Sequence, residues 1–146
     1  NIQGLLGTIH SYVDSGKPML GICLGQQILM SESEEGGHTK GLDLIRGSVL
    51  RFPHTELKVP HMGWNSIGIS GKHPFFEGIP DNTYVYFVHS YYVDTAAGNT
   101  LASSEYGTNF AASVVNDAGN VIGTQFHPEK SGDMGLRMLR NFVNMC

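Results

Sequence analysis

Cys23 stands between two glycines in the stretch Gly21-Ile22-Cys23-Leu24-Gly25-Gln26-Gln27, directly after the apolar run Pro18-Met19-Leu20. Glycines two positions either side of a cysteine let the backbone fold closely on itself without a Cβ clash. The pattern predicts a buried strand over residues 18–22, a sharp turn at Cys23 and a helix that begins at Leu24. A thiol mounted there lies at the edge of a sheet, and the positive end of the following helix favours its thiolate form.

A cysteine after an apolar strand also has a purely structural interpretation, because free cysteine is among the residue types most often buried. A packing cysteine, however, does not need a strained turn. The two flanking glycines therefore favour a nucleophile.

A second candidate group lies at Phe126-His127-Pro128-Glu129. A strand predicted over residues 121–126 ends at His127, and the ends of strands are where α/β proteins place reactive groups. Glu129 is two residues further on, so its carboxylate can orient the imidazole and stabilise its protonated form. Taken alone, the pair could be an ordinary surface His and Glu in a loop. Together with Cys23, it predicts a Cys-His-Glu triad.

The rest of the chain predicts an α/β domain that covers residues 1–146. We expect a mainly parallel open sheet, flanked by helices and extended by an antiparallel patch of strands. Helices are predicted over 1–15, 24–34 and 132–145, and strands over 18–22, 48–52, 66–69, 84–93, 109–115 and 121–126. A loop with one helical turn is expected over 73–80. The expected buried faces are Ile2, Leu5, Leu6, Ile9 and Val13 in the first helix and Leu136, Leu139 and Val143 in the last.

Composition excludes several classes of protein. The chain has 146 residues, 40% of them hydrophobic, and a net charge of -4 without any basic block, which argues against nucleic-acid binding. It contains no apolar run long enough to span a bilayer and no signal-peptide pattern. Its two cysteines form no disulfide framework, which favours a reducing cytoplasm. A zinc site is a weaker alternative, because its candidate ligands lack paired spacing; they are Cys23, His38, His61, His89 and His127.

The motifs Gly-x-Cys-x-Gly-x-Gln and Phe-His-Pro-Glu resemble those of the class I (triad) glutamine amidotransferases. Three further segments resemble the glutaminase subunits of imidazole glycerol phosphate synthases: Lys58 to Asn65 (KVPHMGWN), Tyr86 to Tyr92 (YFVHSYY) and His127 to Ser131 (HPEKS). The resemblance extends over essentially all of the chain. The Pro-His-Met-Gly-Trp-Asn run is the part that points to these synthases.

The resemblance implies glutamine as substrate and a Cys23 thioester as intermediate, with His127 as acid and base and Glu129 as its partner. It implies that the Leu24 backbone N–H is an oxyanion donor, with no cofactor and no metal. The substrate-binding residues implied are Gly25, Gln27, Glu35, His89, Ser90 and Tyr91. A cyclase subunit that receives the ammonia is the implied partner, and the implied interface residues are Met62, Trp64, Asn65, Lys130 and Ser131. Taken alone, Gln27 and Glu35 would fit a solvated helix face, and Trp64 would fit core packing.

The family's domain begins with a strand and a glycine-rich loop that supplies a second oxyanion donor, and nothing before Cys23 matches that loop. We therefore expect that N-terminal sequence is missing here. On that expectation, the 146-residue chain alone has little glutaminase activity, because loss of one donor costs about a hundredfold or more in rate. We also expect an uncovered sheet edge that favours self-association.

Three alternatives remain open at this point. The chain could be another triad glutaminase, of the anthranilate, guanylate or pyridoxal phosphate synthase type, although a His-Gly-Lys segment typical of the first is absent after the turn. It could be a non-catalytic module with the same fold. It could also be a peptidase-like or isomerase-like relative that uses the same turn for a different reaction.

Overall fold

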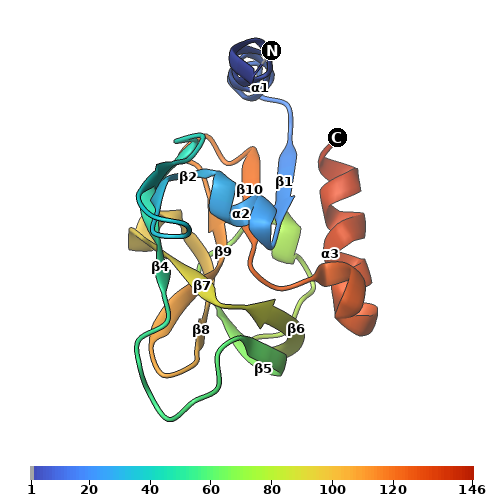
Figure 1. Cartoon of the computed structure of the whole chain (residues 1–146). Coiled ribbons are helices and arrows are strands. Elements are labelled where there is room, and N and C mark those ends of the chain that lie inside the picture. The colour runs from blue at the N-terminus through green and yellow to red at the C-terminus, as the bar shows by residue number, and fades with distance from the viewer. Residues whose placement is uncertain (1) are drawn as a thin grey trace.

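The computed structural model describes residues 2–146 and shows a sheet with helices on its faces (Figure 1). The helices are α1 (Ile2–Asp14), α2 (Leu24–Ile28) and α3 (Gly132–Met145), and the 3-10 turns are η1 (Pro74–Phe76), η2 (Ala97–Asn99) and η3 (Pro128–Lys130). The strands are β1 (Met19–Ile22), β2 (Met30–Ser33), β3 (Thr39–Lys40), β4 (Ile45–Arg51), β5 (His61–Ile69), β6 (Thr83–His89), β7 (Tyr91–Thr95), β8 (Thr100–Glu105), β9 (Asn109–Val115) and β10 (Val121–Thr124).

The sheet follows the order β3-β2-β4-β7-β9-β8-β5-β6, and β10 branches from β9 to pair with β1. β1 and β10 run parallel, with Ile22 opposite Thr124 at their carboxyl ends. Cys23 and the residues that follow Thr124 therefore leave the sheet at the same edge. This is the arrangement that the two motifs predicted.

The α/β fold class is confirmed, but the antiparallel part of the sheet is larger than the sequence predicted. Among residues 2–146, two of the nine strand pairings are parallel, β1 with β10 and β2 with β4, and the other seven are antiparallel. The parallel pairings lie on either side of α2, so the part of the sheet next to Cys23 keeps the expected character.

The helix predicted over residues 24–34 is wrong beyond Ile28. α2 has five residues, and the chain then enters β2, which pairs parallel with β4. The Leu29 carbonyl accepts hydrogen bonds from the backbone N–H groups of Leu44 and Ile45. These long-range backbone bonds compete with continuation of the helix, which is a common way for tertiary context to override local preference.

Three strands were missed, β2 among them, and one prediction joined two strands. Residues 84–93 were predicted as a single strand, but β6 pairs with β5 and β7 pairs with β4 and β9, so the chain changes neighbours at Ser90. β8 and β3 were not predicted, and β5 begins at His61 rather than at residue 66. β9 and α3 have the predicted bounds.

The core lies on both faces of the sheet. At the start of β9, Phe110 and Ala112 belong to one buried cluster, while Ala111 between them belongs to the other. Successive side chains of a strand point to opposite faces, so β9 is covered on both sides. This explains why its seven residues read as a nearly continuous apolar run.

The apolar faces of the two terminal helices differ from the prediction. In Figure 1, α1 stands apart from the sheet, and of its predicted buried face only Val13 is buried, while Ile2 is 78% and Leu5 60% exposed. α3 packs with its Met134, Met138 and Phe142 side inward, which leaves Leu136 and Val143 exposed and Leu139 partly exposed. Among the described residues, no helix combines the length and the apolar character needed to cross a bilayer.

Candidate active site

Cys23 occupies a strained turn, as its flanking glycines predicted. Its φ is 57° and its ψ is -106°, a conformation that non-glycine residues rarely adopt. Gly21 lies so close to the start of α2 that a Cβ there would be 2.5 Å from the Gly25 carbonyl oxygen. The Cys23 backbone N–H donates to the Thr124 carbonyl oxygen at 2.7 Å, which ties the turn to the end of β10.

His127 and Glu129 form the predicted pair. The Nδ1 of His127 lies 2.6 Å from a carboxylate oxygen of Glu129, and the imidazole is mostly covered while the carboxylate is about half exposed. Because the ionised carboxylate only accepts hydrogen bonds, Nδ1 carries the proton of the neutral ring. The Nε2 atom is then left without a proton and can act as a base.

The turn that carries His127 is held by its neighbours. The His127 backbone N–H donates to the Tyr86 carbonyl oxygen at 3.0 Å, and the Ser131 hydroxyl donates to the His127 carbonyl oxygen at 2.6 Å. α3 begins directly against this turn, since a Cβ on Gly135 would meet the Pro128 carbonyl oxygen. Glycine at position 135 therefore allows α3 to pack directly against the loop that carries His127.

The charges of Glu129 and Glu35 both raise the pKa of the Cys23 thiol. Its hydrogen-bond partners are the Gln125 side-chain amide and the Val88 carbonyl oxygen, each at 3.8 Å. Within residues 2–146 it makes no hydrogen bond to His127. Hydrogen bonds between catalytic groups are often loose without substrate and tighten when substrate binds.

Burial raises the pKa of the Cys23 thiol, and this corrects the expectation that the turn favours the thiolate. The Leu24 backbone N–H and the Gln125 amide both lower the pKa, as hydrogen bonds to a thiolate should, but burial is the larger effect. The helix that follows has only five residues. The surroundings of the thiol therefore favour its protonated form.

Two of the implied substrate residues and the implied oxyanion donor Leu24 line one small cavity. Leu24, Gln27 and Glu35 border a space of about 240 Å³ next to α2. Its other lining residues are Ile28, Ser33, Thr39, Lys40 and Gly41. An added Cβ on Gly25 would meet nothing within 4 Å, so this glycine also faces open space. Gln27 itself is buried, and its side-chain amide is already bonded within the chain.

The segment 89–91 is more enclosed than its implied role suggests. His89 is 6% exposed, and its Nδ1 donates to the Tyr91 carbonyl oxygen at 2.7 Å. The Ser90 carbonyl oxygen accepts the Phe52 backbone N–H. Substrate contacts through these three residues stay a prediction, and the His89 ring has a structural role.

Sequence reasoning missed a hydrogen-bonded pair of histidine rings. Since His89 Nδ1 donates to Tyr91, its Nε2 accepts from His61 Nδ1 at 3.0 Å, and Asn65 lies 3.4 Å from the remaining nitrogen of His61. Burial lowers the pKa of each ring to about 4, so both are neutral at pH 7. The two rings meet because His61 and His89 lie opposite each other in the paired strands β5 and β6, and the sequence alone did not reveal that pairing.

Gln125 was also missed. It is fully buried between β10 and His127 and contacts the thiol. A polar residue at the end of an apolar strand, two positions before a candidate catalytic histidine, was the available signal.

The implied partner interface is partly supported. Met62 and Trp64 are 63% and 56% exposed on β5, so Trp64 is not the core residue that its alternative interpretation described. Lys130 is exposed, and Asn65 donates to the Glu105 carbonyl oxygen at its partly buried position. Ser131 is only 3% exposed, and its hydroxyl bridges the Tyr86 N–H and the His127 carbonyl. It is therefore an internal residue that supports the His127 turn.

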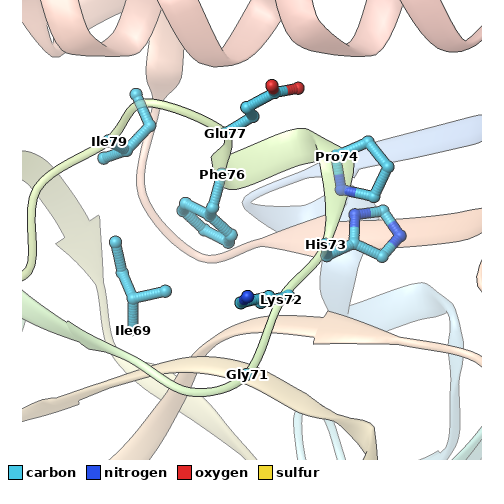
Figure 2. A pocket seen from close by; sticks show the side chains of 8 residues that line it. All are labelled: Ile69, Gly71, Lys72, His73, Pro74, Phe76, Glu77 and Ile79. Carbon is cyan, nitrogen blue, oxygen red and sulfur yellow. The ribbon is translucent and has the colours of Figure 1, made fainter.

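Two other features do not add to the site. A cavity of about 480 Å³ beneath α3 shares no residue with the Cys23 region, and both ring nitrogens of its His73 are bonded within the chain (Figure 2). Among residues 2–146, no three His, Cys, Asp or Glu side chains converge as metal ligands. His38 pairs with Glu32 at 2.8 Å instead.

A cysteine on a strained strand-to-helix turn, with a His–Glu pair in the turn that follows the neighbouring parallel strand, is the arrangement expected of an enzyme with a cysteine nucleophile. The chain belongs to the class-I glutamine amidotransferase family, whose family model matches residues 1–146. Among its relatives, it is 72% identical over 145 residues to the imidazole glycerol phosphate synthase subunit HisH of Methanosarcina barkeri, covering 99% of this chain and 72% of that protein. It is 50% identical to HisH of Methanocaldococcus jannaschii, with the same two coverages.

Solved structures agree on the fold. PurLQS from Thermotoga maritima matches with a TM-score of 0.75 at 21% identity, over 96% of this chain and 67% of that one. A glutamine amidotransferase from the same organism matches with a TM-score of 0.62 at 24% identity, over 98% of this chain and 54% of that one. The resemblance drawn from the motifs is thus confirmed at the level of both family and fold.

Proposed function

We propose that this chain is the glutaminase of an imidazole glycerol phosphate synthase, which hydrolyses glutamine to glutamate and delivers the ammonia to a cyclase subunit. The observation that carries the proposal is the parallel pairing of β1 with β10, because Cys23 and the His127–Glu129 pair follow the carboxyl ends of these two neighbouring strands. High identity to HisH proteins supports the choice of this synthase among the triad glutaminases.

We assign the first step to His127, because its pairing with Glu129 through Nδ1 leaves Nε2 as the base. Its Nε2 removes the thiol proton as sulfur attacks the side-chain amide carbon of glutamine, and Glu129 stabilises the imidazolium that forms. The tetrahedral oxyanion is stabilised by the Leu24 backbone N–H, which already faces the sulfur. The imidazolium then protonates the leaving nitrogen, and the tetrahedral intermediate collapses to release ammonia and leave a thioester on Cys23.

The second half of the reaction uses the same groups in reverse. His127 Nε2 takes a proton from water, whose oxygen attacks the thioester carbonyl carbon. The resulting oxyanion collapses to glutamate, and the sulfur leaves and recovers its proton from the imidazolium. No cofactor is needed for either half.

The cavity beside α2 suits the amino-acid end of the substrate. Glu35 is its exposed acidic residue and can pair with the α-ammonium group of glutamine. Because the Gln27 amide is already bonded to Tyr91 and Gln125, Gln27 supports the wall of this cavity. Substrate selectivity would then rest mainly on Glu35 and on backbone groups.

The exposed apolar residues of β5 suit a protein partner. Met62 and Trp64 lie on one face of that strand, and the exposed Lys130 follows directly after the triad carboxylate. Exposed aromatic and methionine side chains are typical of interface centres. We assign this surface to the cyclase subunit and place the complex in the cytoplasm.

The test uses the full gene product with its cyclase. A glutamine-analogue electrophile, 6-diazo-5-oxo-norleucine, should label Cys23 and leave the exposed Cys146 unlabelled, as read by peptide mass spectrometry. Glutamate release should be abolished by Cys23→Ala. Imidazole glycerol phosphate should form with glutamine as nitrogen source only when the cyclase is present.

Each alternative has its own outcome. Labelling of Cys23 without transfer to the cyclase, but with transfer to an anthranilate or guanylate synthase subunit, would reassign the chain within its family. Absence of both labelling and glutamate release would indicate a non-catalytic module. Labelling without glutamate release would reopen a peptidase-like or isomerase-like reaction.

A further inference from the structure

A continuous set of hydrogen bonds ends on the nucleophile. The Tyr91 carbonyl oxygen accepts the Gln27 side-chain N–H at 3.2 Å, and the same Gln27 nitrogen donates to the Gln125 side-chain oxygen at 3.1 Å. The Gln125 nitrogen then faces the Cys23 sulfur at 3.8 Å. Gln27 is 8% exposed and Gln125 is 0% exposed, so water does not compete for these bonds.

The donor and acceptor of every bond in this series follow from the Tyr91 carbonyl oxygen, where the series begins. A backbone carbonyl can only accept, so the Gln27 amide must turn its NH₂ group toward Tyr91. That NH₂ group also reaches Gln125, which must therefore present its oxygen to Gln27. The one remaining orientation of the Gln125 amide places its NH₂ group against the sulfur. The orientation is set by chemistry, although oxygen and nitrogen of an amide are alike in shape.

The buried histidine pair fixes the same carbonyl. His89 Nδ1 donates to the Tyr91 oxygen at 2.7 Å, and His61 holds His89 through its other nitrogen. His61 stacks on Tyr106, with ring centroids 4.0 Å apart, and is 3% exposed. Because both rings are neutral and enclosed, the anchor of the chain of bonds has little freedom to move.

We propose that Gln125 is a positioning residue for the nucleophile: its side-chain amide, oriented by Gln27 and the Tyr91 carbonyl, donates to the Cys23 sulfur and stabilises the thiolate as it forms. The proposal rests on the proposed function in that it takes Cys23 as the nucleophile. What it adds is a side-chain hydrogen-bond donor to the Cys23 sulfur, the Gln125 amide, which lies outside the triad.

The two contacts of the sulfur act in opposite directions. The Val88 carbonyl oxygen at 3.8 Å can accept only from the protonated thiol, whereas the Gln125 N–H is best used by the anion. Transfer of the thiol proton to His127 would therefore exchange one contact for the other. Gln125 makes this exchange possible without water, since it is already in place.

The test measures the reactivity of Cys23 directly. Iodoacetamide alkylation reports the thiolate, so its rate between about pH 6 and 11 gives the titration of the sulfur. In Gln125→Met, a buried side chain of similar length replaces the donor, and alkylation near neutral pH should be about tenfold slower, because a hydrogen bond to a charged group is lost. The rates of wild type and variant should converge at high pH. Gln27→Met, which keeps the donor but releases its orientation, should give a smaller decrease.

The chain offers two matched controls. Gln26 is as buried as Gln125 and lies next to Gln27 on α2. Its side-chain nitrogen donates to the Ala111 carbonyl oxygen at 3.2 Å rather than to sulfur. Gln26→Met should perturb packing to a similar extent and leave the Cys23 titration unchanged. Cys146, which is exposed, provides an internal reference rate in every sample.

An unchanged titration in folded Gln125→Met, or an equal shift in Gln26→Met, would overturn the proposal. Should the variants not fold, the side-chain NH₂ signals of Gln125 in the wild type should shift as Cys23 titrates and stay constant in Cys23→Ser; constant signals in the wild type would also overturn it. Alkylation does not require glutamine, so the two proposals can fail separately. If the wild type releases no glutamate but Gln125→Met still slows alkylation of Cys23 as expected, the proposed function is wrong and the role of Gln125 stands.

Discussion

Substitution of Gly21 by alanine tests whether the close approach of β1 to α2 sets the geometry of the nucleophile. A Cβ at this position would lie 2.5 Å from the Gly25 carbonyl oxygen and 3.1 Å from the Gln26 backbone nitrogen. Ordinary contact begins near 3.4 Å, so β1 and the first turn of α2 must separate by about 0.9 Å. Both obstacles are backbone atoms, which no change of side-chain rotamer can relieve.

The displacement falls on the groups that perform the chemistry. Leu24, whose N–H faces the sulfur, lies between Cys23 and Gly25, so the oxyanion donor moves with the turn. A misplacement of about 1 Å in an active site costs about a hundredfold in rate, and overpacking costs about 1–3 kcal/mol in stability. We expect kcat for glutamate release to fall about a hundredfold, while the protein remains folded.

The assay is steady-state glutamate release by the protein with its cyclase, with urea unfolding measured in parallel. Gly7→Ala is the matched control, because a Cβ there meets nothing within 4 Å on the exposed helix α1. It should leave kcat unchanged and stabilise the helix by about 0.5–1 kcal/mol. A Gly21→Ala protein with the wild-type kcat would show that the turn tolerates a wider spacing, and the argument from close approach would be refuted.

Three further outcomes follow from the site. His61 and His89 are held neutral with pKa values of about 4, below the ordinary value of 6.5, so their contribution to stability is complete above pH 6.5 and is lost as pH falls toward 4. Urea midpoints should drop across that window, and a flat profile would contradict the burial of the pair. Glu129→Gln should lower kcat about a hundredfold with little change in KM, because the imidazolium loses its carboxylate; an unchanged kcat would remove Glu129 from the triad. Ser131→Ala should cost about 1 kcal/mol of unfolding free energy, since the partly buried Tyr86 N–H loses its acceptor, and a neutral result would return Ser131 to the candidate interface residues.

The parts of the fold that the sequence predicted are those with a local signature. The bracketing glycines predicted the turn at Cys23, and the predicted strands 109–115 and 121–126 correctly separated β9 from β10. The strand-end His127 followed from the same boundaries. In each case a few neighbouring residues restrict the backbone whatever the rest of the chain does.

The parts that failed depended on distant residues. After Ile28, the run Ser31-Glu32-Ser33-Glu34 carries no helical or strand period, and its place in β2 is set by pairing with β3 and β4. In α3, both Leu136 with Val143 and Met134 with Met138 have helical spacing. Period alone could not decide which of these two apolar faces turns inward.

In the candidate site, too, the residues with a local sequence signature were predicted and those that depend on distant partners were not. Cys23, His127 and Glu129 were predicted because reactive groups at strand ends have characteristic neighbours in sequence. Gln125 and His61 were missed because their roles arise from bonds between residues 28 to 102 positions apart. A buried polar side chain shows its purpose only when its partners are known.

The strained turn and the β1–β10 pairing form one unit. An unfavourable φ at a non-glycine residue costs about 1–3 kcal/mol and persists only where the surroundings over-determine it. At Cys23 they do so from both sides: its N–H is held by Thr124 of β10, and its carbonyl oxygen accepts the backbone N–H groups of Gln26 and Gln27. Thr124 is in turn followed directly by Gln125, which contacts the sulfur. The segment that holds the Cys23 turn therefore also carries Gln125, which contacts the sulfur, and two residues further on the proposed base His127.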